Sequence, residues 1–272
     1  MGSENDATND TEERPGHLLA RRGAVASITL NRPDKMNPLD RATIAGLIET
    51  VAEIEAEPAV RVVSITGAGK AFSAGGDLEG YRSLYRDPPA FERFLEDFYS
   101  LNRRIEESTK IYVAIVNGAC VAGGLELMLA CDIVIAAEGA KIGDGHVNFG
   151  QLPGAGSSQR LARIVGPLKA RYLIMTGRII TGREAEALGL VTLAAPAAKL
   201  AETAEALIAE LVTKSPAGLR GAKYLISEGL KHSLDEGLRL ELAFVHNYAT
   251  TEPDAMEGLD AFRDKRAPAY RA

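Results

Sequence analysis

Residues 71–78 read AFSAGGDL and residues 117–126 read NGACVAGGLE, and these two glycine-rich stretches decide the fold. Each follows an apolar run typical of a buried strand, VRVVSIT at 60–66 and IYVAIV at 111–116. Glycine permits backbone conformations and close approaches that other residues do not. Each loop could therefore offer bare backbone N–H groups to a ligand oxygen, although a tight turn explains either loop equally well when it is taken alone.

The sequence around these loops alternates between strand and helix patterns. Asp40 is a good N-cap for a helix whose apolar residues recur at helical spacing and which ends before Pro58. The other predicted elements are a hairpin over 17–30, helices over 91–107 and 123–130, and a strand over 132–137. This alternation predicts an α/β core with a largely parallel sheet that is covered on both faces.

The chain divides into three parts by composition. Residues 1–16 are polar and acidic, and we expect them to form a disordered tail. Residues 17–195 carry the strand–helix alternation, whereas residues 196–272 show helical spacing only. In this last part, one apolar stripe consists of Leu234, Leu238, Leu242 and Val245. Such a stripe indicates packing, for instance against another subunit.

Composition excludes several classes of protein. The 272 residues include 31 Lys and Arg against 37 Asp and Glu, and this net charge of −6 disfavours binding to nucleic acid through phosphates. No apolar run approaches the roughly 20 residues of a membrane span. The two cysteines, Cys120 and Cys131, exclude a disulfide scaffold. In the absence of a secretory or transit signal, they favour a cytoplasmic protein.

Several familiar site motifs are missing. Gly67-Ala68-Gly69 follows a strand, but Phe72 occupies the third glycine position of a dinucleotide-binding fingerprint. Neither a phosphate-binding P-loop nor a Gly-x-Ser-x-Gly nucleophile elbow is present. The four histidines and two cysteines never reach the spacing of metal ligands, so we expect no metal.

The two glycine loops and three further motifs together resemble the crotonase (enoyl-CoA hydratase/isomerase) family. The further motifs are NRP at 31–33 with NPL at 37–39, LPGAG at 152–156 and QRL at 159–161, in the order and at the spacing of the family. The resemblance spans about residues 25–270. It implies a spiral of ββα turns, with a core over 17–195 that binds acyl-CoA. It also implies a helical region over 196–272 that forms trimers or a dimer of trimers.

The resemblance assigns an oxyanion hole and one catalytic carboxylate. Family members act on acyl-CoA thioesters through an enolate, and the two donors to its oxygen would be the backbone N–H groups of Gly76 and Gly123. The position of Gly123 at the N-terminus of a predicted helix supports this role, because unpaired N–H groups and the helix dipole stabilise an anion there. Glu126 follows three residues later and so lies on the same helical face. It would be one of two groups that hold water and move its proton, although a first-turn Glu often only stabilises its helix.

The second carboxylate of the family is replaced in this chain. A gapless alignment from Cys131 to Gly154 puts His146 at that position. A histidine can act as acid or base near neutral pH, and Asp144 is close enough in sequence to orient it or to substitute for it. Equally, His146 could only shape the pocket and leave Glu126 to act alone. The replacement therefore bears on the reaction and not on the fold.

The CoA site also follows from the resemblance. Backbone groups of Ala74 and of Gly76, Asp77 and Leu78 would meet the adenine, and Lys265 would meet phosphates. Lys35 is a weaker phosphate candidate. No cofactor is expected beyond coenzyme A as part of the substrate.

The leading functional hypothesis is hydration of a 2-enoyl-CoA. The alternatives are an isomerase, decarboxylase or thioester hydrolase that uses Glu126 alone, and a non-catalytic paralogue that binds CoA esters or RNA. We expect the length of the acyl chain to depend on residues 79–104 and on Phe149.

Overall fold

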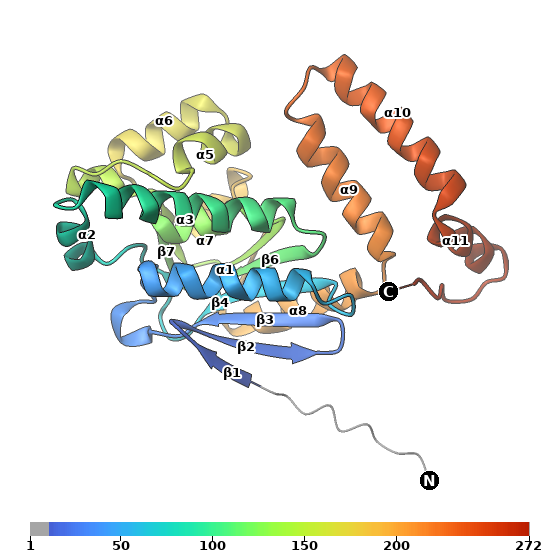
Figure 1. The fold of residues 1–272 in the computed structure, drawn as a ribbon, viewed down its shortest axis with the longest axis horizontal. Coiled ribbons are helices and arrows are strands. Elements are labelled where there is room, and N and C mark those ends of the chain that lie inside the picture. Colours follow the sequence, from blue (N-terminus) through green and yellow to red (C-terminus); the bar gives the residue numbers. More distant parts are fainter. Residues whose placement is uncertain (1–10, 272) are drawn as a thin grey trace, which may run out of the picture.

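The computed structural model describes residues 11–271, and its strands form two sheets (Figure 1). The larger sheet has seven strands in the order β1-β2-β3-β4-β6-β8-β11, and the smaller has four in the order β10-β9-β7-β5. The larger sheet consists of β1 (Thr11–Arg14), β2 (His17–Arg22), β3 (Val25–Leu30), β4 (Val62–Gly67), β6 (Ile111–Val116), β8 (Ile133–Ala137) and β11 (Leu193–Ala195). The smaller consists of β5 (Ala71–Ser73), β7 (Ala119–Val121), β9 (Lys141–Gly143) and β10 (Ile180–Thr181).

Successive ββα turns build both sheets at once. Strands β4, β6 and β8 are parallel neighbours in the larger sheet, and β5, β7 and β9, which follow them along the chain, are parallel neighbours in the smaller one. A helix follows each pair: α3 (Pro88–Glu107), α4 (Gly123–Met128) or α5 (Ser157–Val165). The α/β class and the spiral of ββα turns are therefore confirmed.

Local capping sets where the first helices begin. The side chain of Asp40 accepts a hydrogen bond from the Thr43 N–H and starts α1 (Arg41–Glu55) as predicted. Asp87 caps α3 in the same way through the Ala90 N–H, so α3 begins at Pro88, three residues before the predicted start. Helix α4 ends at Met128 instead of residue 130.

The remaining helices complete both ends of the molecule. Their bounds are α2 (Leu78–Leu84), α6 (Pro167–Thr176), α7 (Gly182–Ala187), α8 (Leu200–Val212), α9 (Pro216–Gly229), α10 (Leu234–Thr251) and α11 (Pro253–Arg263), with 3-10 turns η1 (Pro33–Lys35), η2 (His146–Phe149) and η3 (Ala197–Lys199). Among the residues that the structure describes, no helix is long and apolar enough to cross a membrane.

Strand β1 corrects the expectation of a disordered tail. Thr11–Arg14 pairs antiparallel with β2, and Arg14 and Arg21 form ion pairs with Glu12 and with Glu53 of α1. The charged side chains that indicated a solvated tail thus form ion pairs across the two strands and with a helix. The partner on the helix is distant in sequence, so the sequence did not reveal it. Residues 1–10 of the predicted tail lie outside the described residues.

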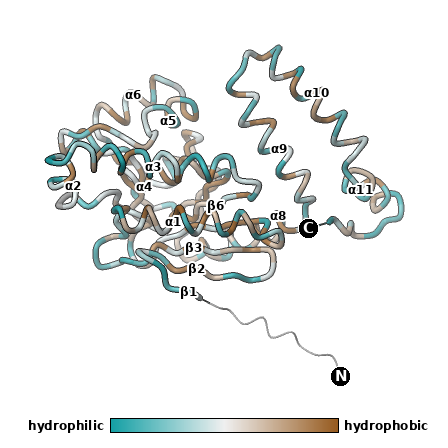
Figure 2. Tube along the Cα trace, in the orientation of Figure 1, coloured by the Kyte–Doolittle hydropathy of each residue, from teal (hydrophilic) through white to brown (hydrophobic). Residues whose placement is uncertain are grey.

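Helices α9, α10 and α11 project from the sheets as an arm (Figure 1). Helix α8 instead packs on the larger sheet through buried Leu200 and Ala204. The chain therefore leaves the core after α8, one helix later than the boundary expected near Ala195. In Figure 2 hydrophobic and hydrophilic residues alternate along α10, and its predicted stripe lies exposed, with Leu234 at 80% and Leu242 at 73%.

Candidate active site

Three loops meet at one edge of the smaller sheet and form a cavity. Residues 74–77 follow β5, residues 122–126 follow β7, and residues 144–146 follow β9. Because these three strands are parallel neighbours, their carboxyl ends lie at the same edge, which is where α/β proteins usually bind ligands. The cavity there has a volume of about 590 Å³, within the range of small-molecule sites.

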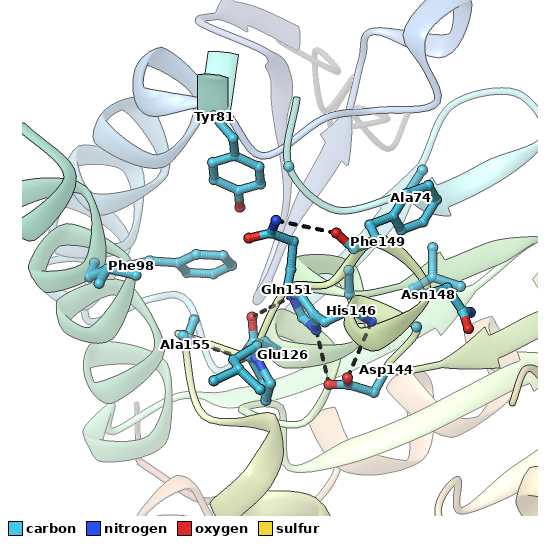
Figure 3. Close-up of a pocket in the computed structure, with 18 of the residues that line it drawn as sticks. Ala74, Tyr81, Phe98, Glu126, Asp144, His146, Asn148, Phe149, Gln151 and Ala155 are labelled. Carbon is cyan, nitrogen blue, oxygen red and sulfur yellow. Dashed lines mark hydrogen bonds and ion pairs between the residues drawn. The ribbon is translucent and has the colours of Figure 1, made fainter. Parts of the chain in front are cut away.

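The cavity has an aromatic wall and a polar floor (Figure 3). The wall comes from α2, the turn after it and α3, and it consists of Tyr81, Tyr85, Phe91, Phe94 and Phe98 together with Leu95. The floor includes Glu126, Asp144, His146, Asn148 and Gln151. Phe149, which the sequence linked to the acyl chain, lines the cavity and is exposed. The arrangement suits an apolar group whose reacting end lies beside a few polar side chains.

The two glycine loops interlock beside this cavity. Gly75 has a φ of +88°, and a Cβ atom added there would lie 2.8 Å from the Cβ of Ala122 and 3.0 Å from the nitrogen of Gly123. A Cβ atom on Gly124 would lie 2.3 Å from the carbonyl oxygen of Ser73. Ala122, the N-cap of α4, itself has a φ of +51°, a strained value for alanine. Positions 75 and 124 therefore require glycine, because the two loops bring their backbones close together there.

The two predicted oxyanion donors lie close to the same cavity. Gly76 lines the cavity, and Gly123 is the first residue of α4, next to Ala122, which also lines the cavity. Within residues 11–271, neither backbone N–H donates a hydrogen bond to another described group. Their role in binding an oxygen atom of a ligand stays a prediction.

Glu126 is held in the floor by two backbone bonds. Its side chain is buried, and its Oε1 accepts hydrogen bonds from the N–H groups of Ala155 at 2.7 Å and Ser157 at 3.1 Å. These bonds stabilise the carboxylate, but burial outweighs them and raises the pKa of Glu126. The second oxygen, Oε2, is left facing His146.

His146 lies between two carboxylates, as Figure 3 shows. Its Nδ1 is 3.1 Å from Oδ2 of the fully buried Asp144, and its Nε2 is 4.0 Å from Oε2 of Glu126. Burial alone would lower the pKa of His146, but the close contact with Asp144 and the charges of both carboxylates outweigh it and raise that pKa. The pKa of Asp144, in spite of its burial, is lowered by the same contact.

The predicted CoA-binding residues fall into two groups. Ala74 lines the cavity, and its N–H bonds to the carbonyl of Met36 at 2.9 Å, which places exposed Lys35 close to the first glycine loop. Gly76 and Asp77 continue that loop, and Leu78 begins α2, with a side chain outside the described set.

Lys265 forms the second group. It follows α11, and α11 and α2 lie at opposite ends of the molecule (Figure 1). One chain therefore does not bring Lys265 to its own glycine loop.

Some site residues were not singled out from the sequence. Tyr81 and Phe98 fall in the region 79–104, which carried no motif of its own. The N–H groups of Ala155 and Ser157 hold Glu126 across about 30 positions of sequence, and only the LPGAG motif at 152–156 marked this stretch. The family resemblance pointed to Glu126 and His146, and closeness in sequence added Asp144; the structure brings these three together.

Known proteins resemble this chain over nearly its whole length. The family model described as enoyl-CoA hydratase/isomerase matches residues 20–272. A probable enoyl-CoA hydratase of Mycobacterium tuberculosis is 36% identical over 253 residues, which cover 93% of this chain and 96% of that protein.

Solved structures agree. A crystal structure of an enoyl-CoA hydratase from Bacillus anthracis superposes with a TM-score of 0.89 at 35% identity, covering 94% of this chain and 98% of that one. One from a Polaromonas species has a TM-score of 0.90 at 31% identity, covering 94% and 99%. With its spiral of ββα turns and its interlocked glycine loops, this chain belongs to the enoyl-CoA hydratase/isomerase, or crotonase, family.

Proposed function

We propose that the protein hydrates a 2-enoyl-CoA, with Glu126 and His146 as the two groups that handle water. The observation that carries this proposal is the separation of 4.0 Å between Nε2 of His146 and Oε2 of Glu126 at the floor of the cavity. A water molecule can hydrogen-bond to both atoms at that separation. The matching relatives that are named as hydratases also support this reaction.

The chemistry requires a base for water and a site for the negative charge. Neutral His146, oriented through Nδ1 by Asp144, accepts a proton at Nε2 while the water oxygen bonds to the β-carbon. The electron pair of the double bond moves to the thioester oxygen, where the N–H groups of Gly76 and Gly123 stabilise it. The His146–Glu126 pair then returns one proton to the α-carbon, so that the product gains one water in total.

The binding of CoA belongs to the same proposal. Backbone groups of residues 74 and 76–78 would meet the adenine, and Lys35 lies exposed near this loop for a phosphate. Lys265 would have to come from a second copy of the chain. The apolar stripe exposed on the arm is consistent with such an assembly, a homotrimer or a dimer of trimers.

A second candidate keeps the site and changes the reaction. Where the family has a second carboxylate, this chain has His146, whose ring lies 3.1 Å from the carboxylate of Asp144. If the contact with Asp144 prevents His146 from transferring protons, Glu126 remains as the acid–base group. Isomerisation, decarboxylation or thioester hydrolysis can proceed with one such group.

A mass-spectrometric screen against enoyl, malonyl-type and 3-oxo acyl-CoA esters separates these reactions. For the hydratase we expect water addition to at least one enoyl-CoA, with kcat lowered by about 10² or more in both Glu126→Gln and His146→Ala. The Gln side chain can still accept the bonds from Ala155 and Ser157, so the Glu126→Gln protein should fold.

Two results would contradict the hydratase. If the wild type hydrates every enoyl-CoA no faster than the Glu126→Gln variant does, the protein is not a hydratase. A His146→Ala variant that changes KM but not kcat makes His146 a wall residue and favours the reactions that use Glu126 alone.

A further inference from the structure

Tyr81 is a cavity residue that the chemistry above does not use. It lies on α2, and a Cβ atom added to Gly76 would lie 2.2 Å from its phenol oxygen. The hydroxyl therefore occupies the space next to the Cα of Gly76, the residue whose N–H is one of the two oxyanion donors. Figure 3 shows this hydroxyl pointing toward the middle of the cavity, on the side opposite His146 and Asp144.

The Tyr81 hydroxyl can donate a hydrogen bond to a ligand. Among the described residues, no hydrogen bond to this hydroxyl is found, although the ring is half-buried. Burial and the charge of Glu126 both raise the pKa of Tyr81, so the phenol keeps its proton at neutral pH. A protonated phenol with no partner in the chain can donate to a ligand atom.

The ring is fixed in this position by its neighbours. It stacks on the ring of Tyr85 with centroids 5.8 Å apart and meets the ring of Phe94 edge-on at 5.6 Å. The bare Cα of Gly76 completes the arrangement, because any side chain there would displace the hydroxyl. Donors that are already in place when charge develops are the ones that stabilise a transition state most.

We propose that the Tyr81 hydroxyl is a third hydrogen-bond donor to the thioester oxygen, beside the N–H groups of Gly76 and Gly123. This assignment rests on the proposed acyl-CoA site. As the β-carbon accepts water, or as a base removes an α-proton, the electron pair moves to that oxygen and the O–H···O bond shortens. The phenol keeps its proton throughout, and no bond to it forms or breaks. Tyr81 is thus a catalytic residue for any reaction at this site that passes through the enolate.

The Tyr81→Phe variant tests this role, because it removes one oxygen atom and keeps both ring contacts. Tyr99→Phe is the matched control, since Tyr99 lies exposed on α3 and is not part of the cavity lining. The first readout is kcat for hydration of an enoyl-CoA. The second is the absorbance of a bound 4-dimethylaminocinnamoyl-CoA, whose maximum moves to longer wavelength when donors polarise its carbonyl.

We expect Tyr81→Phe to lower kcat by about 10-fold or more with little change in KM. It should also reduce the wavelength shift of the bound probe, whereas Tyr99→Phe should match the wild type in both. A Tyr81→Phe variant with wild-type kcat and an undiminished shift overturns the role of Tyr81 and leaves the hydratase standing. A shift that falls in Tyr81→Phe, in a protein that hydrates nothing, supports Tyr81 and removes the hydratase. A probe that binds to the wild type without any shift overturns both proposals.

Discussion

At the scale of single residues, the charge on His146 decides when the site can accept a proton. Only neutral imidazole can take a proton from water, so the reaction needs the pH to lie above the pKa of His146. Asp144 and Glu126 raise that pKa from its ordinary 6.5 in spite of burial. For the hydratase, kcat/KM should therefore fall as the pH decreases through a value above 6.5. The midpoint belongs to the His146–Glu126 pair, because the two groups interact.

The Asp144→Asn variant checks the sign of this effect. Asparagine removes the charge that raises the pKa of His146 and keeps the size of the side chain. We expect the acid limb of the kcat/KM profile to move to lower pH and the maximal rate to fall, because His146 loses its orientation. A pH–rate profile measured beside the wild type gives both quantities. An acid limb that stays in place would show that Asp144 does not set the titration.

The sequence predicted single residues unevenly. Asp144 could be linked to His146 because only two positions separate them. The anchoring of Glu126 by the Ala155 and Ser157 N–H groups could not be predicted, because it depends on how a distant loop folds back. The position of Tyr81 could not be predicted for a similar reason, because its contact with Gly76 depends on where α2 packs.

At the scale of elements, the contact between β5 and α4 holds the two glycine loops together. Gly124 shows how close it is, because a Cβ atom there would lie 2.3 Å from the Ser73 carbonyl oxygen. We expect Gly124→Ala to destabilise the protein by about 2 kcal/mol or more, since backbone must move to admit the methyl group. Gly139→Ala is the control, because a Cβ atom there meets nothing within 4 Å. Urea unfolding of both variants measures the difference, and equal stability would contradict the close contact.

A half-buried lysine, Lys223, links helix α9 to the core. Lys223 Nζ lies 2.9 Å from Oδ2 of Asp132 and donates to the carbonyls of Ile105 and Lys110 at 2.9 and 3.0 Å. We expect Lys223→Met to cost about 1–3 kcal/mol, because it leaves two carbonyl groups and the partly exposed Asp132 carboxylate without their donor. Lys231→Met, which loses only an exposed ion pair, should change stability by less than about 1 kcal/mol.

Urea unfolding measures both lysine variants, and limited proteolysis reports whether the arm has come loose. Earlier cleavage in α9–α11 of Lys223→Met is the expected result. Equal protection in the two variants would mean that other contacts hold the arm.

The pattern of elements was easier to predict than their ends. Hydrophobic periodicity located β4, β6 and α1, because burial of one face or of the whole strand leaves a local signal. Strand β1 left no such signal, since its residues are charged and their partners lie on α1. Helix α8 carries an apolar stripe like that of α10, and spacing alone does not tell which stripe packs on its own chain.

At the scale of the whole molecule, the arm carries apolar surface that a single chain leaves open. Leu230, Leu234 and Phe262 are exposed by 81%, 80% and 87%. Large apolar side chains that are exposed in such numbers on one part of a molecule indicate an interface. Lys265 lies on the same arm, away from the glycine loop of its own chain (Figure 1). A single oligomer would explain both observations, because a neighbouring copy would cover the stripe and could bring Lys265 to a CoA phosphate.

The assembly is tested by mass in solution. We expect light scattering of the wild type to give about three times the chain mass of 28.9 kDa, or twice that again for a dimer of trimers. The double variant Leu234→Glu/Leu242→Glu puts charge on the stripe of α10 without touching the cavity, so it should release single chains that keep their helical content. Glu241→Gln, on the same helix, should leave the mass unchanged. A wild type that runs as a stable single chain would contradict the assembly. Lys265 would then have no route to the CoA site, whereas the arrangement of Glu126, His146 and Tyr81 within one chain would be unaffected.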